Sequence, residues 1–283
     1  MNFHEFLICV ATVNGPKRLE EFIKSVIAYT NDIDYKISIT DDCSDLNYSE
    51  QNREIAIKYG CYYSRNDVRS GVPYSWNRAI EKANCKYLVI ANDDVIVCPK
   101  WLNAYKEIWN SNTHLRLGVI AWPATNNLND ISKDSNQTVS IDYSHIETPI
   151  VACSGYLFAV TKTLATMVQN FDERYFATWE EIDFGAKLCM YGYKSIGLNG
   201  PVIYHEGGAS FRDPINQHPA MIKQSLAQTQ WIDKWSSILK INQNNKTHQQ
   251  LIKEISDKLV SKIPSYKHND FKSIEIKKEV YNE

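Results

Sequence analysis

Along the first hundred residues, short apolar runs alternate with segments whose apolar side chains repeat at helical spacing. These strand-like runs cover residues 6–12, 35–40, 61–64 and 87–91; the first and the last are apolar almost throughout, and all contain many β-prone residues. After the turn at Asn14-Gly15-Pro16, helical spacing relates Leu19, Phe22, Ile23, Val26 and Ile27. Strands that alternate with helices form mostly parallel sheets, because each parallel neighbour needs a crossover connection. The chain is therefore expected to have an α/β fold, with a mostly parallel central sheet flanked by helices.

The rest of the chain continues this pattern and then becomes helical. Strands are expected over residues 117–122, 150–160 and 197–204, and helices over 50–59, 75–83, 99–109 and 181–191. Residues 126–148 are polar and rich in Asn, Ser and Asp, which predicts a long loop. After about residue 218, the segments 221–239 and 246–263 have helical periodicity. These segments predict a C-terminal helical extension.

Composition limits the class of protein. With 283 residues, of which 43% are hydrophobic and 23% charged, the chain resembles an ordinary folded soluble protein. The net charge of −2 provides no electrostatic argument for non-specific nucleic-acid binding. The seven cysteines are scattered without a CxxC pair, which predicts reduced thiols of a cytoplasmic protein and argues against a zinc site. No segment reaches the roughly 18–20 apolar residues of a membrane span, so any membrane contact is expected to be peripheral.

Acidic clusters directly follow two of the expected strands. Asp41 and Asp42 end the second apolar run, and Asn92, Asp93 and Asp94 follow the fourth. Carboxylates are almost never buried unless they are paired or bind a metal, and open α/β sheets bind ligands at the carboxyl ends of their strands. The first cluster can accept hydrogen bonds from a ribose or a base. The second can hold a divalent cation if a diphosphate completes the coordination shell. Both clusters are also common turn or helix-cap signals.

Two further polar clusters come later in the chain. Glu180, Glu181 and Asp183 lie at the start of an expected helix, where acidic residues complement the helix dipole. One of them can also serve as a general base. His205 ends the last expected strand region and precedes Gly207-Gly208, although a single histidine in such a place is more often structural. All four clusters fall at strand ends or helix starts, where an α/β sheet gathers its site, and we predict that they form one site.

The order of these motifs resembles the GT-A fold glycosyltransferases, most closely family 2, which includes rhamnosyltransferase-like enzymes. The resemblance covers roughly residues 5–212, and as an ordered set the motifs are specific, whereas each motif alone is weak. The matching segments are Val10-Ala11-Thr12-Val13-Asn14, Asp41-Asp42-Cys43-Ser44-Asp45, Gly71 with Trp76-Asn77-Arg78, Asn92-Asp93-Asp94, Ser154-Gly155-Tyr156-Leu157-Phe158, Phe171-Asp172-Glu173-Arg174-Tyr175-Phe176, Trp179-Glu180-Glu181-Ile182-Asp183, Lys187, Gly192-Tyr193 and His205.

The resemblance implies a GT-A nucleotide-diphospho-sugar transferase fold and an inverting transfer of a sugar to an acceptor hydroxyl. It implies that Glu181 is the general base, with Glu180 as the competing assignment and Asp183 in the same cluster. It also implies a Mn²⁺ or Mg²⁺ ion that bridges the diphosphate and is held by Asp94, Asn92 and His205. The donor-binding residues that it implies are Thr12, Asn14, Asp41, Asp42, Gly71, Asn77, Asn92 and Asp93.

The chain departs from the family pattern at three positions. Asn92 stands where a strict DXD motif has its first Asp, so metal affinity is expected to depend on Asp94. Glu181 stands where the family has an Asp, and Arg69 where it often has an Asn. A sugar-1-phosphate nucleotidyltransferase is one rival interpretation, but its first loop should be basic and rich in glycine, whereas the loop after Thr12 has one glycine. A non-catalytic nucleotide- or carbohydrate-binding module of the same fold is the other rival.

The resemblance also implies how the chain is organised. A catalytic domain is expected over residues 1–215, with a nucleotide-sugar half over about 1–98 and an acceptor half over about 99–215. The helical extension over 216–283 is expected to be a cap or a homodimer contact, and a peripheral membrane helix is the alternative. The acceptor is left open among a glycan, a lipid-linked glycan, a protein and a modified nucleic-acid base.

Overall fold

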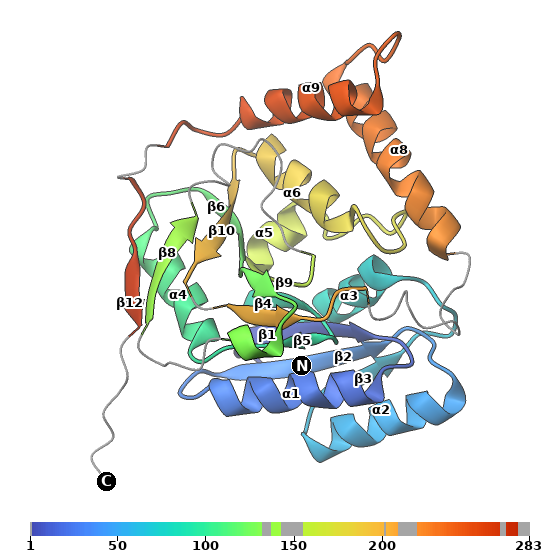
Figure 1. The fold of residues 1–283 in the computed structure, drawn as a ribbon, viewed down its shortest axis with the longest axis vertical. Helices are drawn as coiled ribbons and strands as arrows, with labels where there is room; N and C mark the ends of the chain where they lie inside the picture. Colours follow the sequence, from blue (N-terminus) through green and yellow to red (C-terminus); the bar gives the residue numbers. More distant parts are fainter. Residues whose placement is uncertain are drawn as a thin grey trace.

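A sheet of nine strands forms the centre of the protein among the residues that the computed structural model describes, namely 2–131, 137–142, 155–200, 202–208, 220–266 and 270–276 (Figure 1). The strand order is β12-β8-β10-β6-β9-β4-β1-β2-β3. The strands are β1 (His4–Thr12), β2 (Tyr35–Asp41), β3 (Tyr62–Arg65), β4 (Cys85–Asn92), β6 (Leu117–Ala121), β8 (Gln137–Asp142), β9 (Leu157–Thr161), β10 (Lys194–Asn199) and β12 (Ile274–Ile276).

Helices cover both faces of this sheet. Because side chains alternate along a strand, β1 directs Phe6 and Ile8 into one apolar core and Leu7 into the other. The first core is covered by α1 (Pro16–Tyr29), α2 (Leu46–Lys58) and α4 (Trp101–Ser111), and the second by α3 (Val72–Glu81), α5 (Lys162–Met167) and α6 (Glu180–Met190). The α/β fold class expected from the alternating pattern is therefore confirmed.

The strand register brings the polar clusters to one edge of the sheet. β3, β2, β1 and β4 are parallel neighbours. Thr12 at the end of β1 pairs with Asp41 on one side, and the preceding Ala11 pairs with Asn92 on the other. Parallel strands end at the same edge, so residues that follow β1, β2 and β4 meet there. A small second sheet of β5 (Val95–Ile96), β11 (Ile203–His205) and β7 (Ala124–Thr125) then pairs His205 with Val95.

The C-terminal helices α8 (Ala220–Leu239) and α9 (His248–Val260) lie beyond α6, on the side away from α1 and α2 (Figure 1). They share a third apolar core with α6, to which Trp231 and Trp235 of α8 contribute buried rings. Each such ring removes about 150–250 Å² from water, which is roughly 4–6 kcal/mol of gross hydrophobic stabilisation. The chain then returns to the main sheet, where β12 pairs antiparallel with β8.

Two expectations from the sequence were wrong. The expected loop at 126–148 contains strand β8, whose sequence QTVSID is mostly polar and has no apolar run; its Val139 is buried. The strand region expected over 197–204 is two strands in different sheets, since β10 ends at Asn199 and β11 begins at Ile203. Of the strand expected over 150–160, residues 150–154 lie outside the described residues, and the rest contains β9.

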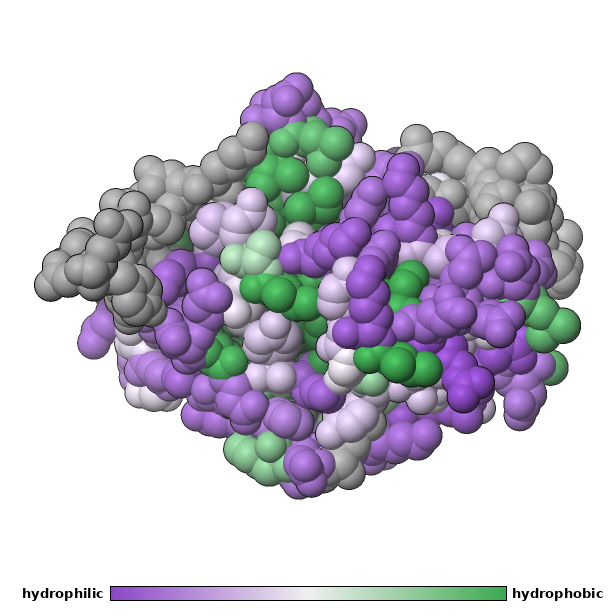
Figure 2. Space-filling model, turned by 90° about the horizontal axis from the view of Figure 1, so that it is seen from below, coloured by the Kyte–Doolittle hydropathy of each residue, from purple (hydrophilic) through white to green (hydrophobic). Residues whose placement is uncertain are grey.

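The surface has no large apolar face in the view toward α1 and α2. There, hydrophobic residues form small patches separated by hydrophilic ones (Figure 2). Scattered exposed apolar residues of this kind, such as Leu46 and Ile57 of α2, are normal for folded proteins. Within the described part of the chain, no helix combines the length and the apolar character that crossing a membrane requires.

Candidate active site

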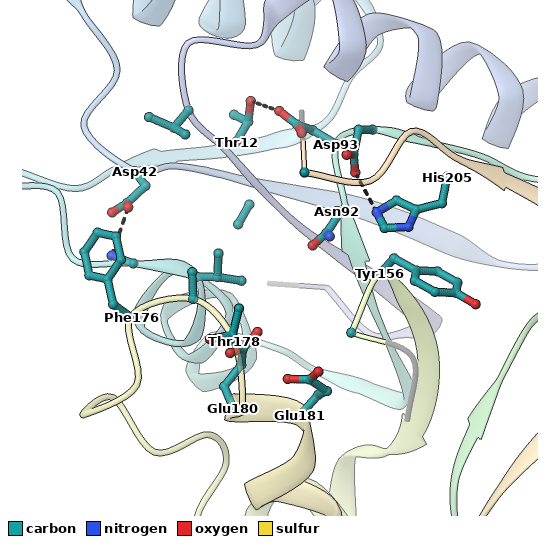
Figure 3. Close-up of a pocket in the computed structure, with 18 of the residues that line it drawn as sticks. Thr12, Asp42, Asn92, Asp93, Tyr156, Phe176, Thr178, Glu180, Glu181 and His205 are labelled. Carbon is teal, nitrogen blue, oxygen red and sulfur yellow. Dashed lines mark hydrogen bonds and ion pairs between the residues drawn. The ribbon is translucent and has the colours of Figure 1, made fainter. Parts of the chain in front are cut away.

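A cavity of about 360 Å³ opens at the edge where β1, β2 and β4 end. It is lined by residues from segments that are far apart in the sequence, and Figure 3 shows them around a common space. Glu180 and Glu181 rise into it from the start of α6, and Asp93 and His205 lie across it. Residues that line it include Thr12, Val13, Asp42, Arg69, Gly71, Asn92, Asp93, Asp94, Gly155, Tyr156, Phe176, Thr178, Glu180, Glu181 and His205.

The first turn of α6 carries two adjacent carboxyl groups into the cavity. Glu180 is only 5% exposed, and the Oε2 atoms of Glu180 and Glu181 are buried and accept no hydrogen bond from the residues that the structure describes. Burial raises the pKa of both carboxyls, and the neighbouring charge of Glu181 raises the pKa of Glu180 further. Two buried carboxylates side by side repel each other, so this pair favours a state in which one of the two carboxyls holds a proton.

The backbone before these carboxyls is held in an unusual conformation. Thr178 and Trp179 have φ angles of 100° and 67°, in the region that side-chain-bearing residues rarely adopt. Trp179 caps α6 without a side-chain hydrogen bond. The hydroxyl oxygen of Thr178 is buried and makes no hydrogen bond within the described segments. Strained backbone of this kind persists only where surrounding contacts hold it, and it concentrates at functional sites.

The residues after β4 divide into two roles. Asp93 contacts the end of β1 and the start of α1: Thr12 Oγ1 of β1 donates a hydrogen bond of 2.6 Å to its Oδ2, and Arg18 Nε of α1 lies 3.5 Å from its Oδ1. Burial raises the pKa of Asp93 to about 6, and the Arg18 charge opposes this rise. Asp94 turns instead toward His205, whose Nε2 lies 3.4 Å from Asp94 Oδ1. The His205 ring is also stacked on Tyr156, with ring centres 4.5 Å apart.

Asp94 and His205 fit a divalent cation as two of its ligands. Asp94 Oδ1 is buried and accepts no hydrogen bond from the described residues, so it keeps a lone pair for a cation. A separation of 3.4 Å lets two ligand atoms share one ion at bond lengths of about 2.1 Å. Over the described ranges, no group of three or more His, Cys, Asp and Glu side chains forms a metal site by itself. An ion held here would need further ligands besides these two, such as diphosphate oxygens or water.

The two aspartates at the end of β2 point to different places. Asp42 lines the cavity and accepts hydrogen bonds from the backbone N–H groups of Ser70 (2.8 Å) and Gly71 (2.9 Å) and from Asn66 Nδ2 (2.8 Å). Burial raises its pKa, although these hydrogen bonds act in the opposite direction. Asp41 lies behind it, where its carboxylate accepts hydrogen bonds from the Ser44 backbone, Asn52 and Tyr63.

Three other predicted site residues also lie outside the cavity lining. Asn14 bonds the chain after β2, since its backbone N–H donates to Ser44 Oγ and its Oδ1 accepts from the Asp45 backbone. Asn77 holds the 171–173 segment through hydrogen bonds to Phe171 O and Glu173 Oε1. Asp183, in the first turn of α6, is completely buried outside the cavity lining. Its carboxylate accepts hydrogen bonds from Lys234 Nζ and Trp235 Nε1.

 In all, nine of the thirteen predicted site residues line the cavity, and the other four, Asn14, Asp41, Asn77 and Asp183, lie behind its walls.

Sequence reasoning missed several residues of the site. Arg18 reaches Asp93 from a helix 75 positions away in the chain, and no local pattern pairs the two. Phe176 approaches Gly71 so closely that its carbonyl oxygen accepts a hydrogen bond from the Val72 N–H at 2.9 Å. Thr178 enters the cavity through its positive φ, which the sequence does not signal.

Comparisons with known proteins agree with this geometry. The family model for glycosyl transferase family 2 matches residues 7–150, half of the chain, and the chain belongs to this family. A comparison of the sequence with curated proteins found no significant match. The α/β fold, with a central sheet flanked by helices, matches the GT-A fold of the similar solved structures.

Two solved structures illustrate the likeness. The S. aureus protein TarS is 14% identical with a TM-score of 0.58, and the match covers 91% of this chain but 43% of TarS. The mannosyltransferase PcManGT from Pyrobaculum calidifontis, solved with GDP-Man and Mn²⁺, is 17% identical with a TM-score of 0.61. That match covers 93% of this chain and 73% of PcManGT. At these identities the likeness establishes the fold alone.

Proposed function

We propose that the protein is a metal-dependent inverting glycosyltransferase that moves a sugar from a nucleotide-diphosphate sugar to an acceptor hydroxyl. The observation that carries the proposal is one cavity with a cation-binding pair, Asp94 and His205, across from two buried carboxyls, Glu180 and Glu181. A sugar transfer needs both the cation-binding pair and a carboxylate base, because charge builds on the leaving diphosphate while the acceptor loses a proton. Membership in glycosyl transferase family 2 supports the same activity.

In this proposal the donor lies between Asp42 and Asp94. Asp42, held by the backbone N–H groups of Ser70 and Gly71, accepts a hydrogen bond from the base or ribose. Asp94 and His205, with the amide oxygen of Asn92, would hold Mn²⁺ or Mg²⁺, and the imidazole favours Mn²⁺. Such an ion, when bound, offsets the negative charge that develops on the leaving diphosphate. PcManGT was solved with GDP-Man and Mn²⁺, and TarS with UDP and with UDP-GlcNAc, which supports a donor of this class.

Glu181 is the proposed general base. Its carboxylate takes the proton of the acceptor hydroxyl while the hydroxyl oxygen attacks the anomeric carbon from the face opposite the diphosphate. The bond from the anomeric carbon to the phosphate oxygen breaks in the same displacement, which inverts the configuration. Burial raises the pKa of Glu181 and so makes its ionised form a stronger base. Gly155 leaves room for this group, since a Cβ there would lie 3.1 Å from Glu181 Cδ.

The test compares binding with turnover. Thermal midpoints are measured with UDP-GlcNAc and GDP-Man, with and without Mn²⁺, and release of UDP or GDP reports donor hydrolysis. Donor at about 100 times its Kd adds roughly 2.7 kcal/mol of stability. The variant Glu181→Gln is expected to keep the Mn²⁺-dependent shift and to lose about 10²–10⁴-fold in turnover. Asp94→Ala is expected to lose both the shift and turnover.

The control for the base is Glu107→Gln, which changes an exposed carboxyl of α4 outside the cavity and is expected to leave turnover unchanged. Full turnover in Glu181→Gln would refute the assignment of the base. A Mn²⁺-dependent shift without any donor hydrolysis or transfer in the wild type would instead favour a non-catalytic nucleotide-binding module.

A further inference from the structure

One face of α8 binds the start of α6 from the side opposite the cavity. Lys234 Nζ lies 2.7 Å from both carboxylate oxygens of Asp183, and Trp235 Nε1 donates a hydrogen bond of 2.9 Å to Asp183 Oδ1. Asp183 is completely buried, and the hydroxyl of Tyr175 adds a longer contact of 3.4 Å. A buried carboxylate needs such partners, because an unpaired charge is costly in a protein interior.

This contact lies directly behind the two carboxyls of the cavity. Glu180 is the first residue of α6 and Asp183 the fourth, and the Asp183 N–H donates to the Trp179 carbonyl at 2.8 Å. The Trp179 ring packs against Trp231 of α8, with ring centres 5.4 Å apart. Trp231, Lys234 and Trp235 share one face of α8, because they are spaced at i, i+3 and i+4. This face therefore holds both the cap and the first turn of α6.

Lys234 also reaches the loop that forms the neighbouring wall of the cavity. Its Nζ lies 2.8 Å from Asp172 Oδ2, at the beginning of the 171–179 loop. The same loop carries Phe176 and Thr178 into the cavity lining. One ammonium group thus connects the two segments that place side chains around Glu181.

The first turn of α6 needs stabilising contacts from another part of the chain. Thr178 and Trp179 have positive φ angles, the cap has no side-chain hydrogen bond, and Glu180 and Glu181 bring two acidic groups together. Each of these features opposes the observed conformation. The contacts from α8 stabilise the first turn of α6 in place of a local side-chain cap.

We propose that Lys234 and Trp235 are positioning residues: through Asp183 they hold the first turn of α6 so that Glu181 faces the reacting atoms. The proposal rests on the proposed function, because the position of Glu181 matters to turnover only if Glu181 is the base. The C-terminal helix α8 then supports the active site from outside the cavity rather than forming a separate cap.

The first experiment compares Lys234→Met with Lys246→Met. Lys246 is a matched control, since it forms its ion pair with Glu254 of α9 in the same helical extension. Amide hydrogen exchange is measured over residues 171–184 and over β4 as an internal reference. In Lys234→Met, exchange over 171–184 is expected to accelerate at least tenfold while β4 is unchanged. The control is expected to match the wild type in both regions.

Donor hydrolysis with UDP-GlcNAc and GDP-Man separates positioning from binding. Lys234→Met is expected to lower kcat at least tenfold, with the donor KM and the Mn²⁺-dependent midpoint shift unchanged. The double variant Asp183→Asn with Lys234→Met removes the unpaired buried charge and keeps an acceptor for Trp235. It is expected to regain most of kcat, and it keeps the test open if Lys234→Met is too unstable to assay.

Three results would overturn the proposal. The first is hydrogen exchange over 171–184 that is unchanged in Lys234→Met. The second is faster exchange over 171–184 with a normal kcat. The third is an equal acceleration of exchange in β4, which would mean general destabilisation. A different pattern identifies failure of the proposed function alone. In that case the wild type hydrolyses neither donor. Hydrogen exchange over residues 171–184 is still faster in Lys234→Met, and it returns to the wild-type rate in the double variant.

Discussion

Gly71 is the position at which a single methyl group should disturb the cavity most. Its φ and ψ angles of 92° and 172° lie in a region that is essentially limited to glycine, which costs other residues about 1–3 kcal/mol. A Cβ at this position would also lie 2.3 Å from the carbonyl oxygen of Phe176. That oxygen belongs to the backbone and cannot rotate away, and overpacking of this kind costs about 1–3 kcal/mol. We therefore expect Gly71→Ala to lower the free energy of unfolding by about 2–6 kcal/mol.

Gly60 provides the matched control. Its φ is 64°, but no atom lies within 4 Å of the position that a Cβ would take. Gly60→Ala therefore has only the backbone cost, about 1–2 kcal/mol. Urea unfolding of both variants measures the difference, and the midpoint should move while the slope stays constant. The Mn²⁺-dependent nucleotide shift should fall in Gly71→Ala alone, because the Gly71 N–H bonds Asp42 in the cavity.

Equal destabilisation by Gly71→Ala and Gly60→Ala would refute this reasoning. It would mean that the Phe176 carbonyl moves aside easily and that the contact does not fix the loop against α3. A large loss of stability with an unchanged nucleotide shift would refute the second part, namely that the Gly71 N–H helps to orient Asp42 for the donor.

Two further predictions concern buried polar groups. Burial raises the folded-state pKa of Glu180, so its contribution to stability is present below its ordinary pKa of 4.5 and is lost as pH rises through the folded value. Glu180→Gln should therefore gain thermal stability relative to the wild type as pH rises from about 5 to 8, and an equal difference at all pH values would contradict this. Thr12→Val removes the 2.6 Å hydrogen bond to Asp93 and should cost about 1–3 kcal/mol in urea unfolding, whereas the exposed Thr113→Val should change little.

Local patterns in the sequence were sufficient to predict the first half of the fold. The buried strands at the positions of β1 and β4 have continuous apolar runs, since a parallel sheet covered on both faces needs apolar side chains on both, and β2 has apolar residues at alternating positions. Strand β8 lies between β12 and β10 and has no such run, and its polar sequence was predicted as loop. A prediction that depends on apolar runs misses a strand whose sequence is mostly polar.

The sequence alone also determined that acidic residues would gather at one edge. Strand ends and a helix start are local features, and the rule that parallel strands end at one edge does not depend on detailed packing. This reasoning brought Asp42, Asp94, Glu181 and His205 into one cavity. The prediction did not require knowledge of which side chains are in contact in the folded protein.

Only the tertiary structure decided which member of each cluster faces the cavity. Asp41 and Asp42 are adjacent and chemically identical, and Asn52 and Tyr63 draw Asp41 away. Asp183 follows Glu180 by three residues, yet Lys234 turns it to the back of α6. The direction of a side chain at a strand end or a helix start is set by partners that lie far away in the chain. Those partners meet only when the chain folds, so no local pattern of residues encodes their choice.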